Sequence, residues 1–409
     1  MSSRATSLAV AVVVSGLLVD ARGAGSGQNP PQQTPTFRAG TDIVVVDALV
    51  AARDGSPIDG LKAEQFEVFI DGRRRPVLSA DLVRASESGH TPAATTTPSA
   101  QPTDGAGRII MLAVDEASFP VAAQQSAREA VTRVVDRVAP EDYLGMITSP
   151  GDIAVAPTRD RRAVRDAIGR IVGARVDAGT SSRFNVSASE AGQLRSRTSV
   201  ATKEIISREC RGAEAFSGIC PQEVMQTAHE ILMTLEQQAM LSLGGLHRTL
   251  DAVASMPGRK TLIVISAGLP MSTQRGSRPD FDAETARIAS RAAAANVNLY
   301  VFYMNVHFLQ FFSASYRKVN HSIYADITMF GHGLERFADY AGGAFFQIEV
   351  DSDPFVERAL RETSASYLLA VRADPKDQDG KEHFIRVAVK ARGATVRHRR
   401  VVTIPVPGR

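Results

Sequence analysis

Three predominantly apolar runs constrain the fold of this chain more than any other feature of its sequence. They are IIMLAV at residues 109–114, KTLIVISAG at 260–268 and VNLYVFYM at 297–304. A strand that is apolar at nearly every position needs cover on both faces, which is typical of parallel sheets flanked by helices. Segments with apolar residues at helical spacing separate the runs, at residues 121–138, 159–173, 228–256, 282–295 and 334–340. Residues 108–350 are therefore predicted to form an α/β domain with a doubly wound, mostly parallel sheet.

Shorter segments with alternating apolar and polar residues flank this domain. Residues 36–85 form an N-terminal β unit with a hairpin tip at Asp71-Gly72, and a low-complexity linker follows at 86–107. Residues 362–406 contain three further alternating segments, SASYLLAVRA, EHFIRVAVKA and VRHRRVVTIP. Because so few strands are marginally stable alone, we expect the N- and C-terminal β units to pack together.

The first 24 residues have the order of a secretory signal peptide. Arg4 precedes an apolar run at residues 8–19, and the small residues Ala21, Gly23 and Ala24 follow. The run is too short for a permanent membrane span, although an uncleaved anchor is the alternative. We expect cleavage between about residues 22 and 27. The mature chain is then exported, to the periplasm or beyond the cell, without a membrane span.

The cysteine and charge content of the chain indicates which bonds and partners to expect. Cys210 and Cys220 are the two cysteines, and in an exported protein such a close pair suggests one disulfide bond, with two free thiols as the alternative. The net charge of +3 is too small to indicate a nucleic-acid partner. The arginine clusters at residues 73–75 and 397–400 lie in strand-like stretches, where a solvated sheet face is expected.

Taken together, these segments resemble the von Willebrand factor A fold, and in particular the exported von Willebrand factor A-related proteins of the acidobacterial type. The resemblance rests on four stretches that span most of the mature chain. They are FRAGTDIVVVDALVAARDGSPIDGLKAEQFEVFIDG, CPQEV, MPGRKTLIVISAGLP and SASYLLAVRADPKDQDGKEHFIRVAVKARG. The resemblance implies strand-end loops that face a protein partner. It also implies a possible divalent metal site above the carboxyl ends of the strands.

The family's metal ligands are only partly present. They are Asp-x-Ser-x-Ser after the first strand, a later Thr, and an Asp after the fourth strand; hard cations such as Mg²⁺ prefer such oxygen ligands. Asp115 and Thr180 match this pattern, and Ser118 is present out of register. Alanine or phenylalanine occupies the other positions, at Ala117, Phe119 and Ala267. We expect a degenerate site without magnesium or another cofactor. Asp115 would then accept hydrogen bonds from loop amides, such as those that open the helix after Pro120. Glu116 could contribute an oxygen, but its position does not match the spacing of the ligand pattern.

Three functional hypotheses remain at this stage. The first is a non-enzymatic module for protein binding or adhesion, because large loops are predicted at residues 182–225 and 307–333. A helix packed on the domain is the alternative for the second loop. A structural or assembly protein of the cell envelope is the second hypothesis. The third is a hydrolase, but no nucleophile motif or phosphate loop is present, and His307, His321 and His332 match no ligand spacing.

Overall fold

The computed structural model describes residues 43–84, 107–176, 183–194, 199–212, 218–256, 259–273, 277–306, 322–349 and 352–406. The expected signal peptide, Thr180, His307 and His321 lie outside these residues. Within them, no helix combines the length and the apolar character that crossing a membrane requires.

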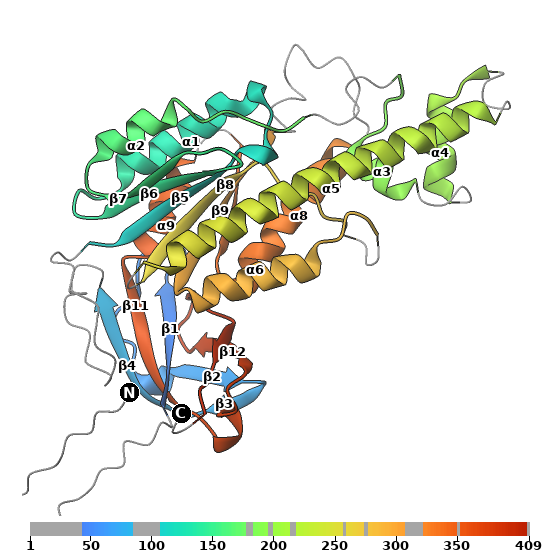
Figure 1. The fold of residues 1–409 in the computed structure, drawn as a ribbon. Coiled ribbons are helices and arrows are strands. Elements are labelled where there is room, and N and C mark those ends of the chain that lie inside the picture. The colour runs from blue at the N-terminus through green and yellow to red at the C-terminus, as the bar shows by residue number, and fades with distance from the viewer. Residues whose placement is uncertain are drawn as a thin grey trace, which may run out of the picture. The chain divides into compact units, whose positions relative to one another are not determined.

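A six-stranded sheet forms the centre of the α/β domain (Figure 1), in the order β10-β9-β8-β5-β6-β7. Five of its strands are paired in parallel: β5 (Ile109–Asp115), β6 (Tyr143–Ser149), β8 (Lys260–Ser266), β9 (Val297–Met304) and β10 (Ala344–Ile348). The edge strand β7 (Ala154–Thr158) is antiparallel to β6. The three apolar runs of the sequence are β5, β8 and β9, which lie side by side in the middle of the sheet.

Helices cover both faces of this sheet. On one face lie α1 (Gln124–Arg137), α2 (Arg161–Ile168) and α9 (Asp353–Glu362); on the other lie α5 (Ile219–Ala254), α6 (Asp282–Ala294) and α8 (Ile323–Tyr340). The strands supply alternate residues to the two cores. Leu112 on β5 packs with α1, whereas Met111 packs with α5. A mixed α/β domain with a mostly parallel sheet is therefore what the periodicity predicted.

Two helical regions differ from the prediction. The helix expected at 334–340 begins at Ile323, because Gly331 and Gly333 lie inside it rather than in a loop. A Cβ on Gly333 would lie 2.3 Å from the carbonyl oxygen of Leu269, so glycine allows α8 to approach the loop after β8. The second region is residues 182–225, where a large loop was expected. It contains α3 (Ala188–Gln193), α4 (Val200–Glu209) and the first turns of α5.

The flanking β units form two antiparallel four-stranded sheets, β13-β1-β11-β4 and β14-β12-β2-β3. The N-terminal unit supplies β1 (Ile43–Ala51), β2 (Phe66–Ile70), β3 (Arg73–Arg75) and β4 (Val77–Arg84). The C-terminal unit supplies β11 (Ala365–Arg372), β12 (Glu382–Val389), β13 (Thr395–His398) and β14 (Val401–Thr403). Both sheets mix strands from both units, so the two units do pack together. The last predicted strand is divided, because β13 and β14 belong to different sheets.

The expected solvated arginine face holds for Arg73, Arg74 and Arg400, which are exposed, but not for Arg75, Arg397 and Arg399, which are partly buried. Arg397 donates to Glu362 at 2.7 Å and to the carbonyl of Gly343 at 2.9 Å, and Arg399 donates to the carbonyl of Ala293 at 2.9 Å. Arg397 lies in β13 and Arg399 directly follows it, next to the ends of α6, α8 and α9. Their contacts join the antiparallel sheets to the α/β domain.

Candidate functional site

Asp115 lies at the carboxyl end of β5 and is 5% exposed. Its Oδ1 accepts a hydrogen bond from the hydroxyl of Ser242 at 2.9 Å, and its Oδ2 accepts one from the hydroxyl of Ser266 at 2.9 Å. Both serines are buried as well. Each oxygen of the carboxylate therefore has a hydroxyl donor from another element of the domain.

Two features of the fold bring these serines to Asp115. β8 pairs with β5 in parallel, so Ser266 ends its strand at the same edge of the sheet as Asp115. Ser242 comes from α5, which can lie close to this edge because its buried face contains Gly245. A Cβ on Gly245 would lie 2.1 Å from the hydroxyl oxygen of Ser149 on β6.

The residues that follow Asp115 are used to build the loop. Ser118 donates its hydroxyl to the carbonyl of Asp115 at 2.6 Å and accepts the amide of Ala267 at 2.8 Å. Ala117 is buried, and Phe119 is fully buried in the apolar core beneath α1. Ser118 thus ties the loop after β5 to the end of β8, and Phe119 anchors the loop in the core.

Glu116 has a separate structural role. Its Oε1 accepts the amide of Val172 at 3.0 Å, and its Oε2 accepts the amide of Gly151 at 3.1 Å. The glycine is needed, because a Cβ there would lie 2.1 Å from Oε2 of Glu116. Both oxygens of Glu116 therefore hold neighbouring loops.

Burial dominates the electrostatics of Asp115. It raises the pKa of the carboxyl from 3.8 to about 6, although hydrogen bonds from the hydroxyls of Ser242 and Ser266 and from the backbone amide of Ala117 act in the opposite direction. A Mg²⁺ site needs several ionised or strongly polar oxygens directed at one point. Here the one carboxylate accepts hydroxyls through both oxygens, and no cluster of three or more His, Cys, Asp or Glu side chains occurs among the described residues. This donor set does not fit a divalent cation.

The hydrogen-bond donors agree in part with those expected. A loop amide does bond the carboxyl of Asp115, but it belongs to Ala117 rather than to a residue after Pro120, and two further donors are serine hydroxyls. Ser242 and Ser266 were not identified as site residues. A signal for Ser242 exists in the sequence, since it interrupts the apolar stripe of a long amphipathic helix beside Leu243. For Ser266, the signal is its place at the end of an apolar strand.

Beyond the strand ends, the first half of α5 packs against α3 and α4 to form an arm that Figure 1 shows extending away from the sheet. Cys210 follows α4 and Cys220 lies in the first turn of α5. Their sulfur atoms lie at bonding distance, 2.05 Å, with the Cα atoms 5.9 Å apart. The two cysteines thus occupy positions that fit the expected disulfide bond.

No protein-family model matches the chain, and no curated protein matches it either. Among solved structures, the chain is similar to one described as conserved hypothetical protein BatB from Bacteroides thetaiotaomicron. The similarity covers 63% of this chain and 97% of that chain, with 14% sequence identity and a TM-score of 0.31.

Proposed function

We propose that this chain is an exported, non-enzymatic module of von Willebrand factor A-like fold that binds a protein partner without a metal ion. The observation that carries the proposal is the bonding of Asp115, whose two oxygens accept hydroxyls from Ser242 and Ser266. In the family that the sequence resembles, this aspartate would bind the metal that a partner's acidic group completes. The hydroxyl donors on both oxygens, together with the burial of the carboxyl, support a structural role for it instead.

The surroundings of the strand ends also favour binding over catalysis. Asp115, Ser242 and Ser266 are buried, so none of them is accessible to a substrate in this conformation. The arm formed by α3, α4 and the first half of α5 enlarges the molecule near the same edge of the α/β domain. Long insertions of this kind commonly carry recognition surfaces on an otherwise rigid scaffold.

A thermal melt with and without metal tests the first half of the proposal. We expect the same melting temperature in millimolar Mg²⁺ or Mn²⁺ as in EDTA, because a ligand stabilises only well above its dissociation constant. Asp115→Asn, which removes the charge while keeping the shape, serves as the matched control. A rise of several degrees with metal that Asp115→Asn abolishes would refute a metal-free site.

Affinity capture from the native envelope with crosslinking tests the second half. We expect the full chain to retain the same crosslinked partner in EDTA and in Mg²⁺. A partner that is lost in EDTA and recovered on adding Mg²⁺ would show that the strand-end site works through a metal. Turnover of an ester or peptide substrate by the purified chain would favour a hydrolase instead.

A further inference from the structure

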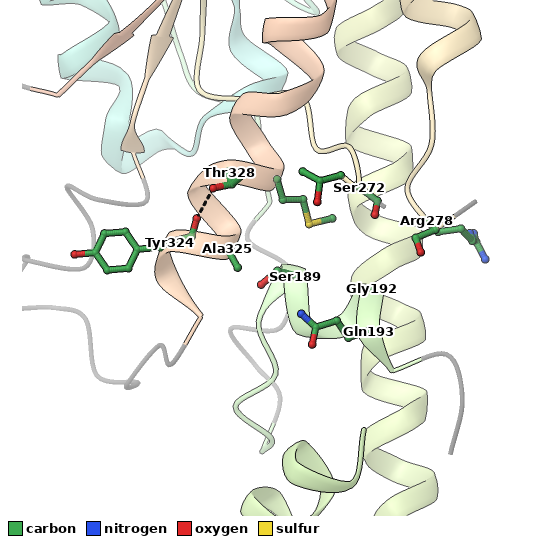
Figure 2. Close-up of a pocket in the computed structure, with 11 residues that line it drawn as sticks. Ser189, Gly192, Gln193, Ser272, Arg278, Tyr324, Ala325 and Thr328 are labelled. Atoms are coloured by element: carbon green, nitrogen blue, oxygen red, sulfur yellow. Dashed lines mark hydrogen bonds between the residues drawn. The ribbon is translucent and has the colours of Figure 1, made fainter. Parts of the chain in front are cut away.

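A pocket of about 330 Å³ lies between α3, the chain that follows β8 and the start of α8. Figure 2 shows Ser189, Gly192 and Gln193 on one wall, with Ser272 and Arg278 on another. The third wall is the first part of α8. Short hydroxyl and amide side chains predominate in the lining: Ser189, Gln193, Ser272, Thr273, Ser277 and Thr328. None of these residues belongs to the Asp115 site.

The pocket has little net charge. Of the described residues that line it, Arg278 alone is charged, and its guanidinium pairs with Glu236 of α5, with Nε 2.6 Å from Oε1. Ala325 and Met329 add an apolar section to the lining. Among the described lining residues, a phosphate or a polyanion would find no unbalanced positive charge. The chemistry instead suits an uncharged ligand with many hydrogen-bonding groups.

Hydrogen bonds to two buried carboxylates, Asp326 and Glu190, hold two walls of the pocket in place. Asp326, which is 3% exposed, accepts the hydroxyl of Ser187 at 3.0 Å and the amide of Ser189 at 2.8 Å. These bonds fix the start of α3 to α8. Glu190 is held by Arg208 of α4 at 2.7 and 2.9 Å. The positions of Ser189 and Gln193 are therefore set by the fold before any ligand enters, which reduces the ordering cost of binding.

We propose that this pocket binds a neutral saccharide of one or two rings. The side chains of Gln193 and Thr273 can both donate and accept, as the hydroxyls of a sugar do. The hydroxyl of Thr328 already donates to the carbonyl of Tyr324 and offers the ligand an acceptor. Ala325 and Met329 can contact the C–H face of the ring. The volume lies near the lower limit of about 300 Å³ for small-molecule sites. Figure 2 shows the Tyr324 ring directed away from the other lining side chains, so hydrogen bonds rather than stacking supply the affinity.

Saturation-transfer NMR on the full-length chain, followed by calorimetric titration, tests this proposal. The probes are glucose, N-acetylglucosamine, cellobiose and diacetylchitobiose, with inorganic phosphate and an uncharged Gly-Ser-Asn peptide as competing classes. We expect at least one saccharide to bind and neither competing class to do so. Binding of the peptide but no saccharide, or of no probe at all, would overturn the proposal.

Two variants localise the binding. Ala325→Trp fills the pocket from an exposed position on α8 and should abolish binding, whereas Ala283→Trp, exposed on α6 outside the pocket, should not. Gln193→Ala removes one polar group and should weaken binding about five- to tenfold, with Gln237→Ala as its control. Saccharide binding that survives Ala325→Trp would place the ligand elsewhere. Both outcomes are independent of the metal melts, which report on Asp115.

Discussion

At the scale of single residues, Asp115 is the buried group whose replacement is most informative. Asp115→Ala leaves the hydroxyls of Ser242 and Ser266 without their acceptor, and each unsatisfied buried group costs about 1–3 kcal/mol. We expect a loss of about 2–5 kcal/mol in the free energy of unfolding, measured by urea denaturation. Asp115→Asn keeps an amide oxygen as acceptor and should cost clearly less. Equal losses in the two variants would contradict this account.

The raised pKa of Asp115 makes a second prediction, about pH. The folded carboxyl titrates near pH 6, whereas the unfolded one titrates near 3.8. Between these values the folded state binds the extra proton, so this group's contribution to stability falls as the pH rises. Relative to Asp115→Asn, the wild type should therefore lose stability between about pH 4 and pH 6 and then level off. Paired denaturation series at each pH measure this difference, and a flat or rising difference would show that the pKa is not raised.

At the scale of elements, the arm depends on the link between α4 and α5. Cys210 and Cys220 are both 2% exposed, and they lie ten positions apart in the sequence. Closing so small a loop stabilises the fold by roughly 2–3 kcal/mol. In the double variant Cys210→Ser/Cys220→Ser, we expect faster amide exchange in α4 and the first turns of α5, but unchanged exchange in β5 and β8.

Non-reducing peptide mapping of the chain purified from its native host provides the direct check on the cysteine pair. It should yield one linked pair of peptides that contain Cys210 and Cys220. Two thiols that react with an alkylating reagent before reduction would show that the pair is not bonded. Unchanged exchange in α4 would show that the bond, if present, does not stabilise the arm.

At the scale of the whole described unit, Glu362 connects the α/β domain with the antiparallel sheets. Its carboxylate accepts from Arg358 of α9 at 2.8 Å, from Arg397 of β13 at 2.7 Å and from Tyr300 of β9 at 3.2 Å. Removing one partner of a buried ion pair typically costs about 3–5 kcal/mol. Glu362→Ala should lower the melting temperature strongly or separate the melt into two transitions.

The exposed residue Glu357 of the same helix is the matched control for this measurement. It pairs with Arg137 and Arg361 with 48% of its side chain accessible, and such surface pairs contribute about 0–1 kcal/mol. Scanning calorimetry of Glu357→Ala should therefore resemble that of the wild type. If Glu362→Ala also leaves the melt unchanged, the two parts are held together by other contacts.

Much of the architecture follows from local pattern. β5, β8 and β9 were predictable because strands covered on both faces must be apolar at successive positions. The helices that cover them were predictable because one buried face repeats every three to four residues. Asp115 could be identified as a strand-end residue for the same reason. These features depend on neighbours along the chain, which the sequence records directly.

The tertiary structure alone decided which distant residues meet. Ser242 reaches Asp115 across 127 positions of sequence, and Arg397 reaches Glu362 across 35. Neither pairing produces a periodic pattern in the sequence, because each depends on how closely one helix or strand can approach another. Gly245 allows α5 to lie close to β6, and Gly333 allows α8 to lie close to the loop after β8. In the sequence alone, a glycine within a helical pattern indicates the end of a helix equally well. The sequence by itself therefore determined the elements and the aspartate at the strand end. Packing determined that serine hydroxyls surround this aspartate and that arginines join the sheets to the α/β domain.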